Sequence, residues 1–504
     1  MKEKIEMVRC YNIVKFRPPY PLPKGEDDQG VGDGKILLLF DLAKGSKFRV
    51  QSSEFIDQSR FSVASTVKYP ASNTLHRISG IQYRIIMVLL LLGFCSNLSA
   101  QEEAYFYHVN PYNFIRYDLN TMHFPGNRLA FDRMEDKLEQ LMTTGKGRIN
   151  IVHIGGSHIQ AGMYTGQMRT RFQQLDGGMN AGWGFMFPYR ISHTNSPFGY
   201  YIRYNGAWRS FRNVESRKIG TLGAGGISVT TSSPKAELTI LLEKENKLDY
   251  RFNKLRIYYE NLEKNYDINI DPALINAVNQ TDDYVDFSLN QSVDSLQIML
   301  VKHAGKAGNF TLFGITTESA PNGIMYHALG VNGAHVPDFL RCQLFTKQLA
   351  EMKPDLVILG IGINDAYGRR FSQEHFEDNY DQLISEIKQA APNAAIVFTT
   401  NNDSYLYRRY VNKNGEKVRE SMFRMAKKYN AGVWDMFEVM GGLNSIVLWQ
   451  KNGLAQSDKI HFTREGYLLI ADLFFNAMMQ DFEQYIGTRN KLTINSRFEE
   501  MTNE

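Results

Sequence analysis

The stretch Arg148-Ile-Asn-Ile-Val-His-Ile-Gly-Gly-Ser157 decides the fold of this chain. Its first seven residues are mostly apolar and β-branched, which is typical of a buried strand. Two glycines and a serine follow, and residues 159–174 then have helical character. The stretch therefore predicts a strand, a tight turn and a helix, with Ser157 at the turn.

Further short apolar runs follow the same pattern toward the C-terminus. Buried strands are predicted at 355–360, 394–399 and 431–435, and helices at 372–390, 416–430 and 464–485. This alternation predicts an α/β domain with a parallel sheet flanked by helices. Ligands of such sheets bind at the carboxyl ends of the strands.

Between the first strand and this C-terminal part the pattern changes. Helical signals are nearly absent there, and successive strands are predicted at 200–204, 226–231, 236–242, 254–259, 295–301 and 309–315. Many short strands separated by turn residues are typical of a sandwich or jelly roll. We therefore expect an all-β domain inserted into the α/β domain.

Composition limits the class of protein. The 504 residues are 43% hydrophobic and 22% charged, as in ordinary globular proteins, which excludes a disordered, collagenous or multi-span membrane protein. The 57 Lys and Arg nearly balance the 53 Asp and Glu, so no nucleic-acid partner is indicated. Cys10, Cys95 and Cys342 lie far apart and match no metal-binding spacing. We expect neither a metal nor an organic cofactor.

Residues 87–100 have the pattern of a signal peptide. An apolar core is followed by Leu-Ser-Ala100, and Arg77 and Arg84 supply positive charge before it. The core is too short to span a bilayer, so we expect cleavage after Ala100 and no stable membrane span in the mature chain. A signal core belongs near the start of a chain, which makes residues 1–86 an upstream extension from an overcalled start codon.

Ser157 is the first of three places that can carry chemistry. A serine between a strand and a helix can expose its hydroxyl at the edge of the sheet, where the helix amides face developing negative charge. This position suits a nucleophile. The same segment also fits a simple tight turn in which Ser157 caps the helix.

The other two places are turns. Gly362-Ile-Asn364-Asp365 follows a strand, and the Asn364 amide can donate a hydrogen bond to an oxyanion, although the segment also fits a common turn. Asp458-Lys-Ile-His461 precedes a helix, and its spacing lets the carboxylate orient the imidazole for proton transfer. An ordinary surface loop is the alternative for this segment.

Together these segments resemble the conserved blocks of the SGNH, or GDSL-type, hydrolase superfamily. Gly155-Gly156-Ser157, Gly362 to Asp365 and Asp458 to His461 stand at its first, third and fifth blocks, and Val331-Asn-Gly333-Ala334 resembles the second. The resemblance implies a three-layer α/β/α domain and a Ser157-His461-Asp458 triad. It also implies an oxyanion hole of the Ser157 and Gly333 amides and the Asn364 side chain.

Further residues narrow the resemblance to the peptidoglycan O-acetylesterase branch, which joins an SGNH domain to a carbohydrate-binding-like jelly roll. They are Ser157 to Gln160, Tyr164 to Gly166, Arg169 and Gly182 to Phe185. The domains expected are 101–189 and 327–490 for the hydrolase, 190–326 for the inserted sandwich and 491–504 for a tail.

Several other residues are further candidates for the site or its surroundings. His158, Gln160 and Trp183 are candidates for binding substrate, although core packing suits Trp183 equally. His153 is expected to be structural because it lies within the strand. Cys342 lacks a glycine turn and is not expected to be a nucleophile.

One residue departs from the family pattern. Gly156 stands where the first block has an aspartate, which puts the hydrogen bonding around the nucleophile turn in doubt. We therefore expect a secreted serine esterase, periplasmic in a Gram-negative bacterium, that removes O-acetyl groups from peptidoglycan. The alternatives are a deacetylase or acetyltransferase acting on another polysaccharide, and a non-catalytic glycan-binding protein.

Overall fold

A computed structural model describes residues 112–175, 178–244, 246–368 and 370–502, with side chains described as far as residue 490. The expected signal peptide and the extension before it lie outside these residues.

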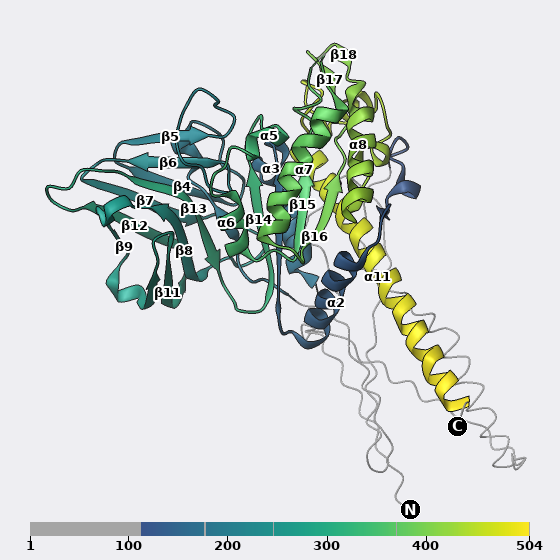
Figure 1. The fold of residues 1–504 in the computed structure, drawn as a ribbon, viewed down its shortest axis with the longest axis horizontal. Coiled ribbons are helices and arrows are strands. Elements are labelled where there is room, and N and C mark those ends of the chain that lie inside the picture. Colours follow the sequence, from purple (N-terminus) through teal and green to yellow (C-terminus); the bar gives the residue numbers. More distant parts are fainter. Residues whose placement is uncertain (1–111, 176–177, 245, 369, 503–504) are drawn as a thin grey trace, which may run out of the picture. The chain divides into compact units, whose positions relative to one another are not determined.

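A six-stranded sheet forms the centre of the α/β domain (Figure 1). Its strands, in spatial order, are β1 (Met122–His123), β19 (Gly432–Trp434), β16 (Ala395–Thr399), β15 (Leu356–Gly360), β2 (Arg148–Gly155) and β14 (Gly323–Gly330). All neighbours pair in parallel except β1 with β19. The predicted α/β class with a parallel sheet is confirmed.

Alternate residues of each central strand point into different cores, as the two-residue period of a strand requires. In β2, Ile149 and Ile151 pack on one face, and Val152 and Ile154 on the other. The first face is covered by α2 (Leu129–Thr144), α4 (Met163–Gln173) and α11 (Arg464–Thr502), and the second by α6 (Phe345–Met352), α7 (Gln373–Ala390) and α8 (Asn414–Tyr429). Because both faces are covered, the domain has three layers.

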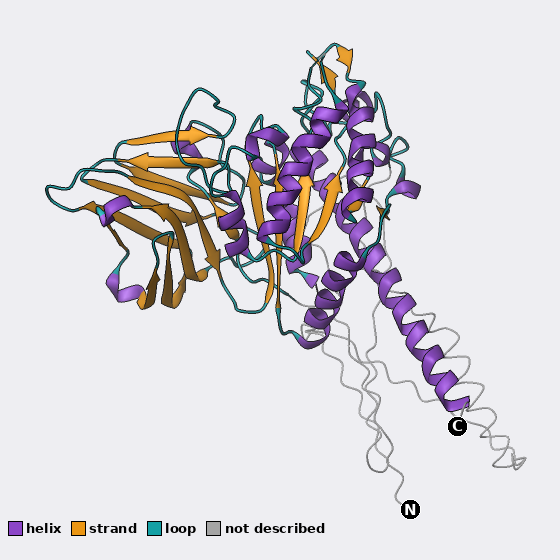
Figure 2. Cartoon of the chain, viewed as in Figure 1, coloured by secondary structure: helices purple, strands orange, loops and turns teal. Residues whose placement is uncertain are grey.

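The inserted region consists of two antiparallel sheets (Figure 2). One contains β10 (Ile275–Gln280), β11 (Tyr284–Val293), β8 (Phe252–Glu260), β13 (Phe310–Glu318), β6 (Ile227–Thr231) and β5 (Trp208–Arg212), and β3 (Gly184–Met186) also pairs with β13. The other contains β4 (Tyr200–Asn205), β7 (Lys235–Leu242), β12 (Ser295–Lys302) and β9 (Tyr266–Asn269). The expected all-β insertion is thus present.

The remaining elements are short. They are α3 (Ser157–Gln160), α5 (Val336–Phe339), α9 (Met436–Val439), α10 (Ile446–Lys451), the hairpin of β17 (Tyr405–Leu406) and β18 (Tyr410–Val411), and 3₁₀ turns at Tyr117–Leu119, Tyr189–Ser192, Leu262–Lys264 and Pro272–Leu274.

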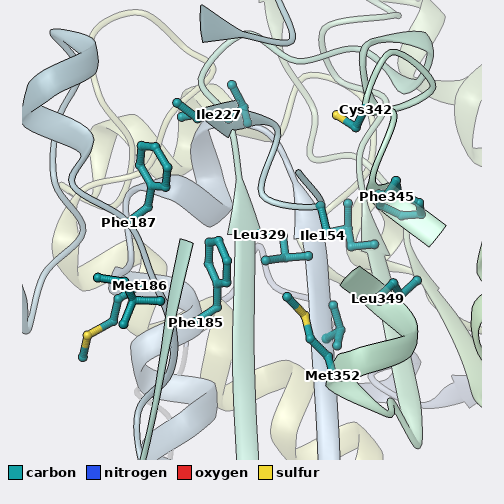
Figure 3. Packing of buried hydrophobic residues seen from close by; sticks show 14 of the residues in the cluster. Ile154, Phe185, Met186, Phe187, Ile227, Leu329, Cys342, Phe345, Leu349 and Met352 are labelled. Atoms are coloured by element: carbon teal, nitrogen blue, oxygen red, sulfur yellow. The ribbon is translucent and has the colours of Figure 1, made fainter. Parts of the chain in front are cut away.

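The sandwich and the α/β domain share one core. In Figure 3, Leu329 of β14 lies between Ile154 of β2 and Phe185 of β3, and α6 contributes Phe345 from the other flank. The boundary expected at residue 326 falls inside β14, which belongs to the parallel sheet, and β3 joins the sandwich before residue 190. The hydrophobic core is therefore continuous from the sandwich to the α/β domain.

The helix expected over 159–174 is interrupted, so this prediction is wrong in detail. Gly162 adopts a left-handed φ of +79° and separates α3 from α4. A Cβ at this position would lie 2.5 Å from the Cβ of Pro197. The close approach of the 193–199 loop thus requires glycine, and the left-handed turn ends the first helix after Gln160.

Candidate active site

The carboxyl ends of three neighbouring strands bring the first three motifs together. β2 lies between β14 and β15, and the strands pair in parallel as far as Gly155, Gly330 and Gly360. Gly156-Ser157, Asn332-Gly333 and the Asn364 turn follow these strand ends. Motifs that are far apart in the sequence therefore meet at one edge of the sheet.

Ser157 and His461 form the first half of a hydrogen-bonded chain. Ser157 is the first residue of α3, and its Oγ lies 2.7 Å from Nε2 of His461. Nδ1 of the same ring lies 2.7 Å from Oδ2 of Asp458. A neutral imidazole with its proton on Nδ1 satisfies both contacts, since it donates to the carboxylate and accepts from the serine hydroxyl. This geometry can remove a proton from Ser157.

A tight turn holds Asp458 against His461. The backbone N–H groups of Ile460 and His461 both donate to Oδ1 of Asp458 at 3.0 Å. Lys459, which directly follows Asp458, has a φ of +57°. Burial opposes ionisation of Asp458, but the hydrogen bonds from the His461 side chain and the two backbone amides outweigh it and lower the carboxyl pKa. The Asp458 side chain is 24% exposed and that of His461 32%, so a substrate can reach the relay.

Hydrogen-bond donors surround the space beside Ser157. Gly333 has a φ of +82°, which suits glycine, and open space lies where its Cβ would stand. The Asn364 amide donates one hydrogen bond to the carbonyl of Ala334 at 2.9 Å. This contact orients the amide and leaves its second N–H for another acceptor. The group is therefore suited to bind an oxygen that develops negative charge.

Part of the chain that forms this arrangement matches a known protein family. Residues 317–469, which contain the motifs at Gly333, Asn364 and His461, match the family model for the GDSL-like lipase/acylhydrolase family. The α/β domain has the SGNH-type fold. No curated protein matches the chain.

Several solved structures are similar to this chain at low sequence identity. A structure titled "Peptidoglycan O-acetylesterase in action, 5 min" is 20% identical, covers 72% of this chain and 99% of its own, and superposes with a TM-score of 0.58. A lipase/acylhydrolase from Enterococcus faecalis is 20% identical over 32% of this chain and 78% of its own, with a TM-score of 0.26. A family two carbohydrate esterase from Cellvibrio japonicus is 13% identical over 56% and 99%, with a TM-score of 0.23.

Gly156, the departure from the SGNH pattern, leaves the relay geometry in place. A Cβ at this position would lie 3.2 Å from Nδ2 of Asn364 and 3.8 Å from the carbonyl oxygen of Ala334. The side chain that the family pattern has here would therefore point at the Asn364 amide. In this chain the Ala334 carbonyl alone is seen to orient that amide.

A polar run after β16 supports the His461 turn and was missed in the sequence. Nδ2 of Asn402 donates to the carbonyl of Ile460 at 2.9 Å, and the backbone N–H of Tyr405 donates to the carbonyl of Lys459 at 3.1 Å. The run Thr400 to Asp403 directly follows the buried strand β16, like the motifs that were recognised. The same signal points to this loop as part of the site.

Gln160 is buried and connects two loops. Its Oε1 accepts a hydrogen bond from the backbone N–H of Asn332 at 2.7 Å, and its Nε2 donates to Oγ1 of Thr194 at 2.8 Å. Because Asn332 precedes Gly333, Gln160 positions the loop that carries Gly333. Only 2% of the residue is exposed, so a role in direct substrate contact does not fit this structure.

His158 lies beside the relay without joining it. Its ring centre is 5.2 Å from that of His461, and its Nδ1 is 2.8 Å from the Tyr467 hydroxyl. Burial, with a smaller contribution from His461, lowers the pKa of His158 to about 3. The ring is therefore neutral at pH 7 and places no second positive charge next to His461.

Trp183 does not line the site, which corrects its candidacy for sugar stacking. The ring is 4% exposed and packs edge-on against Tyr200 and Tyr250. The Arg169 guanidinium lies 4.3 Å from the ring centre. These neighbours leave no ring face for a sugar.

His153 and Cys342 are also interior residues. His153 is fully buried with Nδ1 2.8 Å from the Tyr326 hydroxyl, and burial lowers its pKa to about 3. Burial raises the pKa of the Cys342 thiol to about 12, so it carries no thiolate at neutral pH.

Asp365 is a half-buried carboxylate that directly follows Asn364. Its oxygens accept from the backbone N–H of Val336 at 3.2 and 3.3 Å. Burial raises the pKa of Asp365 to about 6, although His335 and the Val336 amide oppose the rise. This edge of the sheet thus contains a group that ionises near neutral pH.

The described residues contain no cluster of three or more His, Cys, Asp or Glu suited to a metal ion. Among them, no helix combines the length and apolar character needed to cross a bilayer.

Proposed function

We propose that this protein is a serine O-acetylesterase that removes acetyl groups from a glycan, with peptidoglycan as its substrate. The observation that carries the proposal is the continuous chain from Ser157 Oγ through His461 to Asp458, with 2.7 Å at each step. A hydroxyl, an imidazole and a carboxylate in this order are the parts of a nucleophilic relay.

In the proposed reaction Ser157 Oγ attacks the ester carbonyl while its proton passes to Nε2 of His461. Asp458 stabilises the imidazolium that forms. The carbonyl oxygen becomes an oxyanion and binds the amides of Ser157 and Gly333 and the Asn364 side chain. Collapse breaks the bond to the sugar oxygen, which takes the proton from His461, and leaves acetyl on Ser157. Water, activated by His461, then releases acetate and restores the enzyme.

The substrate class is supported by the shared fold rather than by the relay. The structure whose title names a peptidoglycan O-acetylesterase covers the hydrolase and the sandwich together, since the likeness spans 72% of this chain. A second polysaccharide substrate, or transfer of the acetyl group to a sugar hydroxyl in place of water, would use the same relay.

The proposed location outside the cytoplasm is supported by the sequence. The signal-peptide pattern at residues 87–100 supports export, and a peptidoglycan substrate fits the periplasm of a Gram-negative bacterium. N-terminal sequencing of secreted material should find a mature start at Gln101. Peptides from residues 1–79 in that material would contradict both the cleavage site and the overcalled start.

The deciding experiment measures acetate release from p-nitrophenyl acetate and from O-acetylated peptidoglycan. Ser157→Ala should abolish turnover of both, whereas Ser210→Ala, a serine of the sandwich, should leave it unchanged. Unchanged turnover in Ser157→Ala would refute the relay. No turnover by the unmodified protein, together with retained glycan binding, would instead identify a non-catalytic glycan-binding protein.

A further inference from the structure

A large cleft lies where the 193–199 loop meets β4 of the sandwich. We call it the Arg190 cleft, lined by Ala161, Arg190, Asn195, Phe198, Tyr201 and Arg203, among others. Its volume is about 890 Å³, near the upper end of the range of roughly 300 to 1,000 Å³ that ligand pockets occupy. The hydrolase domain supplies one wall and β4 the other.

The Arg190 cleft begins next to the proposed active site. Ala161 follows α3, whose first residue is Ser157. The side chain of Asn195 accepts a hydrogen bond from Nδ2 of Asn332 at 2.6 Å, and Asn332 precedes Gly333. A ligand seated in the cleft therefore lies along a wall that is bonded to the oxyanion loop.

A second contact joins the cleft to the His461 side of the site. Phe198, at the cleft, is 46% exposed. The guanidinium of Arg464, three residues after His461, lies 5.6 Å from its ring centre. Phe198 thus connects the lining of the cleft to the segment that follows His461, and its exposed ring adds apolar surface that a sugar can contact.

The charge of the Arg190 cleft is positive. Arg190 and Arg203 are exposed, and within the described part of the chain neither pairs with a carboxylate. Arg203 instead donates to the Tyr201 hydroxyl at 3.1 Å. The one acidic residue of the lining, Glu243, already accepts a hydrogen bond from the backbone N–H of Gly199 at 3.2 Å. The cleft therefore presents two guanidinium groups that no carboxylate of the described residues neutralises.

We propose that the Arg190 cleft binds a carboxylate-bearing part of the glycan, so that the enzyme prefers acidic acetylated glycans to neutral ones. This inference rests on the proposed function, because it assigns the substrate class of the same site. Guanidinium groups match the planar, two-oxygen geometry of carboxylates, and an exposed aromatic ring beside them suits the sugar to which the acid is attached.

The test measures binding first, so that it does not depend on turnover. On a Ser157→Ala background, dissociation constants are measured by calorimetry for an O-acetylated muropeptide and for the same muropeptide with its carboxylates amidated. The free acid should bind about three- to tenfold more tightly, because exposed ion pairs contribute modestly. Raising the salt concentration should reduce this preference.

Variants then locate the preference. Arg190→Gln with Arg203→Gln should bring the two dissociation constants together, whereas Arg209→Gln, an exposed arginine on β5, should leave the preference intact. The far-UV circular dichroism spectrum and the urea unfolding midpoint of the double variant should match those of the parent, which shows that it is folded.

Two results would overturn the inference. One is equal binding of the two muropeptides by the parent protein, and the other is a preference that survives in the double variant. Neither depends on catalysis. A protein that prefers the free acid but shows no esterase turnover would contradict the proposed function while supporting the cleft.

Discussion

The proposed catalytic edge of the parallel sheet and the Arg190 cleft are connected by the Asn332–Asn195 hydrogen bond but are built differently. At the edge, three adjacent parallel strands end at Gly155, Gly330 and Gly360, and short turns after them present polar groups. The cleft is formed by a loop, by β4 of the sandwich and by the residues after α3. One region is set by strand register, the other by the packing of two domains.

The difference teaches where chemistry and specificity reside in this molecule. The edge presents groups that act on any ester, because a nucleophile, a base and oxyanion donors do not recognise the alcohol. The cleft presents charge and an aromatic ring at a distance from the reacting carbonyl. We therefore expect changes at the edge to affect all substrates alike, and changes in the cleft to affect only glycans.

The largest effect should come from His461→Ala. Removing the base should lower kcat on p-nitrophenyl acetate by about 10⁴- to 10⁶-fold. Ser157→Ala combined with His461→Ala should be no worse than either alone, because the two residues act as one unit. Steady-state kinetics on the single and double variants measures this.

The matched control for this prediction is in the sandwich. Arg209→Gln should keep the unmodified rate on the same ester. A multiplicative loss in the double variant would show that Ser157 and His461 act independently, and the distinction between the edge and the remainder of the molecule would then fail.

Asn364→Ala should have the next largest effect. It removes a donor whose direction is set by the Ala334 carbonyl, and it should lower kcat by about 10²- to 10³-fold, or roughly 3 to 4 kcal/mol of transition-state stabilisation. The loss should be the same on p-nitrophenyl acetate and on O-acetylated peptidoglycan. If only the glycan lost turnover, Asn364 would act in substrate recognition and not in the reaction at the ester carbonyl.

The pH dependence of stability offers a third comparison. Asp365 has a pKa of about 6 in the folded protein against an ordinary value of 3.8. The folded state therefore holds its proton more tightly, and the associated stability is present below about pH 4 and lost as pH rises through 6. Two pKa units correspond to up to about 3 kcal/mol.

Asp365→Asn removes this titration while keeping an oxygen for the Val336 amide. Relative to the parent, the variant should gain up to about 3 kcal/mol in free energy of unfolding between pH 4 and pH 7.5, measured by urea denaturation. Asp282→Asn, at a side chain in the sandwich that is 91% exposed, should show no such gain. An equal gain in both variants would place the effect outside the catalytic edge.

The sequence predicted the edge better than its surroundings, for a physical reason. Because β2 and β15 are buried on both faces, β15 is an uninterrupted apolar run and β2 is rich in β-branched apolar residues, so the polar residues after each strand stand out. β14 also lies in the parallel sheet, but it comes directly after the sandwich strand β13; no strand was predicted there, and the expected domain boundary at residue 326 divides it.

The regions that were missed depend on tertiary packing. β10 is mostly exposed and carries little apolar periodicity, so it was not predicted as a strand. The break between α3 and α4 follows from the contact of Gly162 with the 193–199 loop. Arg190 and Arg203 belong to no motif, and only the folded chain places them in one cleft. The burial of Trp183 likewise follows from its contacts with Tyr200 and Tyr250.

The smallest effect should come from Gly156→Ala, at the one departure from the family pattern. Gly156 has a φ of −92°, which is outside the left-handed region that favours glycine. The added Cβ would lie 3.2 Å from Nδ2 of Asn364, so the amide must yield by only a few tenths of an ångström. We therefore expect kcat on p-nitrophenyl acetate to stay within about threefold of the unmodified rate.

Comparison with Asn364→Ala makes this measurement informative. If Gly156→Ala lost as much as Asn364→Ala, the open space at Gly156 would be a requirement for the oxyanion donor, and the glycine would be a functional adaptation of this chain. If the loss is small, the Ala334 carbonyl is sufficient to hold Asn364, since the amide keeps that hydrogen bond at 2.9 Å. The catalytic edge then depends on strand register and on its own turns, and not on the side chain that the family pattern places beside the nucleophile.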